Sequence, residues 1–353
     1  MKKSLQITIL LLVSLILSAC FFNDVPTAQG PTQLIPEDQN DEPSAYEEVS
    51  NKEAETEEAA QESTPLFQMS IEALRQKDYS GGEFVTEETL VNGTNYQQFV
   101  VSYRSEGLKI YGLLTVPLAE RPETGFPAIV FIHGYIPPNQ YSTTENYSTY
   151  QAALARAGFI TFKPDLRGHG NSEGESVSSH YSEKYVVDTL NALAYLKDFK
   201  DTDPNRIGYW GHSNGGSIGL RAILVDEDIQ AASLWAGVVG SYEAMFETRV
   251  DEIPFLEQDN PLTQLHGLPS AGGRFWQQTE PYFYLDEITV PIELQHGTGD
   301  ASVPIELSQE LKEALEAEGK TVEYFEYSRD DHNISKNVDQ AWKRSIEFFK
   351  EHL

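Results

Sequence analysis

Two five-residue stretches of the chain fit the pattern G-x-S-x-G, which is typical of a serine nucleophile on a tight turn between a strand and a helix. They are GNSEG at residues 170–174 and GHSNG at residues 211–215. The turn functions where a strand ends at the first glycine and a helix begins behind the serine, because a helix N-terminus stabilises developing negative charge. One active site needs one such serine, so the flanking residues must decide between Ser172 and Ser213.

The flanking residues favour Ser213. An apolar run at residues 206–210 leads directly into the first glycine of GHSNG, and GSIGLRAILVDE at residues 216–227 is typical of a helix. Ser172, in contrast, is separated from the preceding apolar run by polar residues, and no helical periodicity follows it. We therefore expect Ser213 to be the nucleophile and Ser172 to lie in a loop.

The partners of a serine nucleophile can be sought by position, because in folds with this turn an acid and then a histidine follow the serine in chain order. Of the eight histidines, only His332 lies between the last predicted strand and the last predicted helix. His212 adjoins the serine and His296 lies in the turn that ends the acid-bearing strand, so neither is expected to be the base. Asp300 follows that strand and is predicted to be the acid; the alternative is that it is only a turn residue.

Two backbone or side-chain donors are expected to stabilise the oxyanion. The N–H of Asn214, directly after the nucleophile, is one of them, and the second should come from Tyr135 through its N–H or its hydroxyl. No H-E-x-x-H motif and no paired C-x-x-C motif occurs, so we expect neither a metal nor another cofactor. Gly168 and Gly170 do not match a dinucleotide-binding loop, because the third glycine falls one place late.

Apolar runs and amphipathic segments alternate along the chain after residue 66. Eight strands are predicted, the first two as an antiparallel pair, at residues 96–103, 109–116, 128–132, 159–162, 206–210, 231–235, 291–295 and 321–327. Helical stripes of apolar residues lie at 186–193, 307–315 and 338–349. This alternation indicates an α/β fold with a mostly parallel sheet and helices on both faces. Residues 238–289 are predicted to form a short lid or pocket wall.

The first 65 residues have a different character. Residues 1–20 combine two lysines, an apolar run and small residues before Cys20, the chain's single cysteine, and this ending resembles the lipobox of bacterial lipoproteins. An ordinary signal peptide or an N-terminal anchor helix is the alternative. Residues 21–65 hold twelve acidic residues and one lysine, which predicts a disordered linker before a catalytic domain at 66–353. We expect a protein that is exported and lipid-anchored through Cys20 to a membrane of the bacterial cell envelope.

The net charge of the chain restricts its partners. A formal charge of −30 argues against binding to nucleic acid, which requires a basic surface to neutralise phosphates. We therefore expect a small or medium ester or peptide as substrate and no nucleic-acid partner.

Three stretches, DLRGHGNSEG, GHSNGG and TVPIELQHGTGDASVP, resemble the catalytic domain of the prolyl oligopeptidase family within the α/β-hydrolase superfamily. The resemblance extends over most of residues 96–353. It implies the α/β-hydrolase fold, with Ser213 as nucleophile, Asp300 as acid and His332 as base.

Peptidases of that family usually carry a β-propeller over the active site. Residues 66–126 are too short for two propeller blades of roughly 40–50 residues each, which predicts a more open site. Our hypothesis is therefore a serine hydrolase acting on carboxylic esters. A peptidase similar to prolyl oligopeptidase is the alternative, and a non-catalytic solute-binding lipoprotein, which would need no ordered Ser-Asp-His set, is a distant one.

Overall fold

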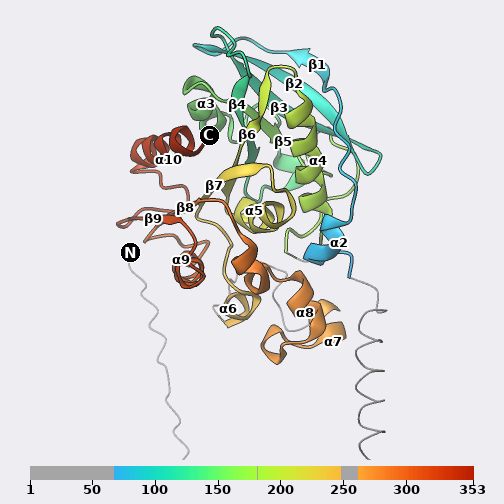
Figure 1. Ribbon diagram of the computed structural model, residues 1–353, viewed down its shortest axis with the longest axis vertical. Helices are drawn as coiled ribbons and strands as arrows, with labels where there is room; N and C mark the ends of the chain where they lie inside the picture. Colours follow the sequence, from blue (N-terminus) through green and yellow to red (C-terminus); the bar gives the residue numbers. More distant parts are fainter. Residues whose placement is uncertain (1–66, 181, 248–260) are drawn as a thin grey trace, which may run out of the picture. The chain divides into compact units, whose positions relative to one another are not determined.

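The computed structural model describes residues 67–180, 182–247 and 261–353 (Figure 1). The predicted signal peptide, the lipidation site Cys20 and the predicted acidic linker lie outside the described residues. No helix of the described ranges combines the length and the apolar composition that crossing a bilayer requires.

A single sheet forms the centre of the described chain. Its order is β1-β2-β3-β5-β4-β6-β7-β8-β9, and the five pairs from β5–β4 to β8–β9 are parallel while the other three are antiparallel. The predicted α/β fold with a mostly parallel sheet is therefore confirmed. The strands are β1 (Val85–Thr89), β2 (Tyr96–Ser105), β3 (Leu108–Pro117), β4 (Phe126–Ile132), β5 (Ile160–Pro164), β6 (Thr202–His212), β7 (Ile229–Trp235), β8 (Ile292–Gly297) and β9 (Val322–Tyr327).

All eight strands expected from the sequence are present, and the sheet has one strand more. The additional strand, β1, has the sequence VTEET, and each of its five residues is exposed. A strand that buries no side chain leaves no pattern of alternating apolar residues, which is why the sequence did not reveal it. The two outer strands each carry two glutamates, Glu87 and Glu88 on β1 and Glu323 and Glu326 on β9.

Helices cover both faces of the sheet. The helices of the described residues are α2 (Ile71–Arg75), α3 (Ser148–Arg156), α4 (Lys184–Asp198), α5 (Asn214–Val225), α6 (Tyr242–Glu247), α7 (Pro261–His266), α8 (Arg274–Thr279), α9 (Glu306–Ala317) and α10 (Val338–His352). One hydrophobic cluster joins α4, α5 and α9 to the sheet, and a second joins α3 and α10 to it.

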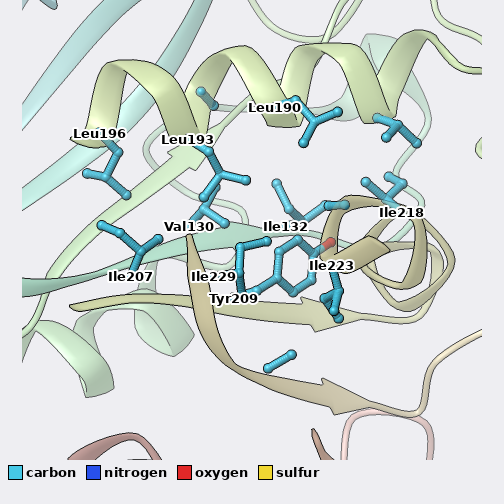
Figure 2. Packing of buried hydrophobic residues seen from close by; sticks show 14 of the residues in the cluster. Val130, Ile132, Leu190, Leu193, Leu196, Ile207, Tyr209, Ile218, Ile223 and Ile229 are labelled. Carbon is cyan, nitrogen blue, oxygen red and sulfur yellow. The ribbon is translucent and has the colours of Figure 1, made fainter. Parts of the chain in front are cut away.

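Strand β4 shows why the central strands are apolar on both faces. Val130 and Ile132 belong to the first cluster, whereas Ile129 and Phe131 belong to the second. Figure 2 shows the first cluster from close by, with leucines of α4 directed toward side chains of the strands; the labelled residues include Leu190, Leu193, Leu196, Val130, Ile132, Ile207 and Tyr209. Burial of such side chains on both sides is the main source of stability for a parallel sheet.

The segment between β7 and β8 packs with Met69, Val303 and Leu307 in a third, smaller cluster. Phe275 and Trp276 of α8 are buried with Tyr242 and Met245 of α6. These aromatic side chains therefore pack in a core. Residues 248–260 of this segment lie outside the described residues.

Candidate active site

The turn between β6 and α5 has the geometry that the GHSNG sequence predicts. Strand β6 ends at His212 and helix α5 begins at Asn214, so Ser213 is the single residue between them. Its φ of 56° and ψ of −116° lie in a region that residues with a Cβ atom rarely adopt. Such backbone strain persists only where the surrounding structure determines it fully, and it is common at active sites.

Hydrogen bonds and close packing impose this conformation. The Ser213 N–H donates to the Trp235 carbonyl (3.0 Å), and the Ser213 carbonyl accepts from the amides of Gly216 (2.9 Å) and Val238 (3.0 Å). A Cβ atom on Gly215 would lie 2.4 Å from the Ile132 carbonyl oxygen, so only glycine lets the helix approach the sheet this closely. The flanking glycines of the motif are thus required by packing.

Asp300 and His332 are hydrogen-bonded to each other. His332 Nδ1 lies 2.7 Å from Asp300 Oδ2, and the Asp300 side chain is fully buried while that of His332 is 20% exposed. The other carboxylate oxygen accepts from the backbone amides of Ser302 (2.8 Å) and Val303 (3.0 Å). Burial alone raises the pKa of Asp300, but hydrogen bonds from His296 and His332 outweigh it and keep this pKa well below its usual range.

A second histidine, which the sequence did not single out as a functional residue, also contacts Asp300. His296 Nε2 lies 3.0 Å from Asp300 Oδ2 and 3.1 Å from the Val303 carbonyl oxygen. A carbonyl oxygen only accepts, so this nitrogen carries the hydrogen. His296 Nδ1 lies 2.7 Å from Ser308 Oγ, and the ring is fully buried. His296 therefore helps to fix the orientation of Asp300.

The loop that carries His332 is held by its two neighbouring aspartates. Asp330 accepts hydrogen bonds from the amides of Lys336 and Asn337 at 3.0 Å, and Asp331 accepts from the amide of Ser335 at 2.9 Å. The carboxylates closest to His332 in sequence thus brace the loop, and the more distant Asp300 binds the imidazole.

The histidine before the serine is also part of this arrangement. His212 Nε2 lies 2.9 Å from the carbonyl oxygen of His332, and His212 Nδ1 lies 2.6 Å from the Tyr147 hydroxyl. The His212 and His332 rings lie 4.6 Å apart between their centroids. Neither His212 nor Tyr147 could be identified from the sequence, because the contact with His332 joins residues 120 positions apart.

Ser213 and His332 line one cavity of about 410 Å³. Asn214 and Tyr135 line it as well, and Tyr135 is 68% exposed. The predicted lid segment contributes one of its described residues, Val238. The remaining wall is largely apolar with a serine-rich loop, and includes Leu166, Val177, Ser178, Ser179, Tyr185 and Ile218.

The loop after β4 packs closely against the serine. A Cβ atom on Gly134 would lie 2.6 Å from the Tyr147 hydroxyl oxygen and 3.0 Å from Ser213 Cβ. Gly134 is therefore packed against the serine with no room for a side chain, and Tyr135 follows it in the same cavity wall.

The other serine of the G-x-S-x-G pair has a structural contact. Ser172 lies in a loop, and its Oγ accepts a hydrogen bond from the Tyr111 amide at 2.9 Å. Within residues 67–180, 182–247 and 261–353, no group of three or more His, Cys, Asp or Glu side chains is arranged to hold a metal ion.

The sequence pattern of the prolyl oligopeptidase family matches residues 145–353, more than half of the chain. The chain belongs to this family, and it is a serine hydrolase with an α/β-hydrolase fold. The matched span begins later than the start near residue 96 that the sequence motifs suggested.

Known proteins of two kinds are similar to the chain. The uncharacterized peptidase YtmA of Bacillus subtilis is 27% identical over 250 residues, which cover 70% of this chain and 91% of YtmA. A puromycin-hydrolyzing peptidase of Mycobacterium tuberculosis superposes with a TM-score of 0.59 at 21% identity, covering 74% of this chain and 40% of the peptidase. An acetyl xylan esterase from Paenibacillus sp. R4 gives a TM-score of 0.59 at 18% identity and covers 78% of this chain and 91% of the esterase.

Proposed function

We propose that the protein is an exported carboxylesterase in which Ser213 is the nucleophile, His332 the general base and Asp300 the acid. One observation carries this proposal: the buried Asp300 carboxylate binds His332 at 2.7 Å, and His332 lines the same cavity as the strained Ser213. Nucleophile, base and orienting acid are the three parts of a serine-hydrolase triad.

The proposed reaction follows from the hydrogen bonds of His332. Its Nδ1–H donates to Asp300, which leaves Nε2 as the acceptor for the proton of Ser213 when Oγ attacks the carbonyl carbon. The ionised Asp300 stabilises the imidazolium that forms. His332 then returns the proton to the leaving alcohol, and water repeats the sequence to release the acid from the acyl-enzyme.

The oxyanion of each tetrahedral intermediate requires hydrogen-bond donors beside Ser213. We assign this role to the N–H of Asn214, the first residue of α5, and to Tyr135, through its N–H or its hydroxyl. Both residues line the cavity, and the N-terminus of α5 adds favourable electrostatics. A Tyr135→Phe variant separates the two options, because it removes only the hydroxyl.

The preference for esters rests on the shape of the described domain. Residues 67–126 form α2, strands β1 to β3 and the start of β4, and thus belong to the same sheet as the site. A cavity of about 410 Å³ is suited to a small or medium acyl group. Cleavage of an amide depends more on binding energy from remote parts of the substrate, because its leaving group is poorer.

A peptidase is the second candidate, and a specific observation favours it. YtmA, which the chain covers to 91% of its length, is named a peptidase, although an uncharacterized one. The two candidates predict opposite rankings of substrates. We therefore propose esters as the preferred substrates and peptides as the alternative.

The test has two steps. A fluorophosphonate probe should label the wild type and a Ser172→Ala variant but not Ser213→Ala, whose kcat should fall by about 10⁶. Then kcat/KM for p-nitrophenyl acetate to butyrate is compared with that for aminoacyl and prolyl anilides, each divided by its rate with hydroxide. Loss of labelling in Ser172→Ala would contradict the choice of nucleophile, and dominance of the anilides would contradict the ester preference.

We also propose that the enzyme acts outside the cytoplasm, attached to a membrane of the bacterial cell envelope through a lipid on Cys20. The sequence of residues 1–20 supports this location, and the acidic segment at 21–65 would serve as a linker.

A further inference from the structure

A directional chain of hydrogen bonds links two loops of the site. The Tyr147 hydroxyl lies 2.6 Å from His212 Nδ1, and His212 Nε2 lies 2.9 Å from the His332 carbonyl oxygen. Its first member directly precedes α3, and its last member is the proposed base. We call Tyr147, His212 and His332 the His212 chain.

The direction of each bond in the His212 chain is determined by chemistry. The His332 carbonyl can only accept, so Nε2 of His212 carries a hydrogen. Burial, together with the charge of a protonated His332 nearby, lowers the pKa of His212 to about 3, which keeps this imidazole neutral at ordinary pH. Its Nδ1 is therefore an acceptor, and the Tyr147 hydroxyl must donate to it. Tyr147 thus selects the tautomer of His212 that can bind His332.

The surroundings of His332 explain why such a contact matters. The loop contains two non-glycine residues with positive φ, Arg329 (55°) and Ile334 (53°). The imidazole is oriented by Asp300, but its distance from Ser213 also depends on where the main chain of His332 lies. A hydrogen bond to that main chain fixes this position from the side of the serine.

We propose that His212 is a positioning residue for catalysis, which fixes the main chain of the base His332 relative to Ser213, and that Tyr147 acts with it. The proposal rests on the proposed function, since it assigns roles around the same triad. Neither residue exchanges a proton with the substrate. The competing interpretation is that His212 only fills the core beside Trp210, with which its ring is stacked at a centroid distance of 6.3 Å.

A matched pair of substitutions at His212 separates positioning from packing. His212→Gln keeps an N–H donor close to the position of Nε2, and His212→Met has a similar length without a donor. We expect His212→Met to lower kcat, per site titrated with fluorophosphonate, by about 10- to 100-fold, because displacement of a catalytic group by about 1 Å can cost 10²-fold. KM should change less than about threefold, and His212→Gln should return kcat to within about fivefold of the wild type.

A second variant removes only the hydroxyl that selects the tautomer. Tyr147→Phe keeps the ring and should lower kcat by about 3- to 10-fold, the effect of one neutral hydrogen bond. Tyr79→Phe is the matched control, because the Tyr79 hydroxyl donates to the Leu74 carbonyl at 2.8 Å and Tyr79 does not line the cavity. Its kcat should stay within about twofold of the wild type.

The outcomes are distinguishable from failure of the proposed function. A wild type that is neither labelled at Ser213 nor active on esters and anilides would overturn the proposed function. If the wild type is labelled and active, two results would overturn the positioning role alone. One is a His212→Met variant that is as active as the wild type, and the other is a His212→Gln variant that is as slow as His212→Met. If both His212 variants fail to fold, a kcat for Tyr147→Phe equal to that of Tyr79→Phe overturns it.

Discussion

Replacing Ser213 by glycine should stabilise the protein while abolishing its activity. The φ of 56° and ψ of −116° at this position are unfavourable for any residue with a Cβ atom, but accessible to glycine. Three backbone hydrogen bonds keep the residue in this conformation whatever its side chain is. The strain is therefore present in the native state and is released by the substitution.

The size of the effect follows from two opposing contributions. Relief of the strained backbone contributes about 1–3 kcal/mol. Glycine gains conformational freedom in the unfolded chain, which offsets about 0.5–1 kcal/mol of this. The free energy of unfolding should thus be about 0.5–2 kcal/mol larger for Ser213→Gly than for Ser213→Ala. The alanine variant is the right reference, because it also lacks the hydroxyl but retains Cβ.

Urea denaturation of the two variants at the same pH measures this difference through the midpoint, provided that the slopes agree. The thermal midpoints should differ by about 1–4 °C in the same direction. A Ser213→Gly variant that is equal to or less stable than Ser213→Ala would show that the turn stores no strain at this residue.

Two further predictions concern other parts of the chain. Glu293 lies between Ser233 and Ser345, and burial raises its pKa to about 7. The native state therefore binds more protons than the unfolded state, and the free energy of unfolding falls as the pH rises from about 4 to 7. Glu293→Gln should therefore be more stable than the wild type at pH 8, by about 3 kcal/mol, and nearly equal to it at pH 4, as urea denaturation at the two pH values would test. A Cys20→Ser precursor should lose fatty-acid incorporation and membrane attachment, and equal metabolic labelling of variant and wild type would contradict the lipobox.

The elements of the fold were predictable where burial leaves a pattern in the sequence. The eight apolar runs all form strands, because each buries side chains on at least one face of the sheet. Strand β1 was missed because none of its side chains is buried. The order of strand, turn and helix also predicted which residues would meet, and Ser213 and His332 do line one cavity.

The parts of the site that the sequence did not reveal depend on tertiary contacts. His212 and His296 were set aside because neither occupies the chain position expected of a base, yet one binds the His332 main chain and the other binds Asp300. The cavity wall was expected from residues 238–289. Among the described residues, the loop at 176–180 forms more of it, and its serine-rich sequence has no periodicity from which this role could be read.

The glutamates on the two outer strands affect how molecules of this protein meet in solution. The edge of an open sheet presents unpaired N–H and C=O groups that can pair with the edge of another molecule. Here Glu87 of β1 is ion-paired with Lys109, but Glu88 of β1 and both glutamates of β9 have no such cation among the described residues, so pairing of two edges brings carboxylates close together. Repulsion across such a pairing disfavours the growth of a continuous intermolecular sheet, and this protection weakens as the medium becomes acidic enough to neutralise the carboxylates.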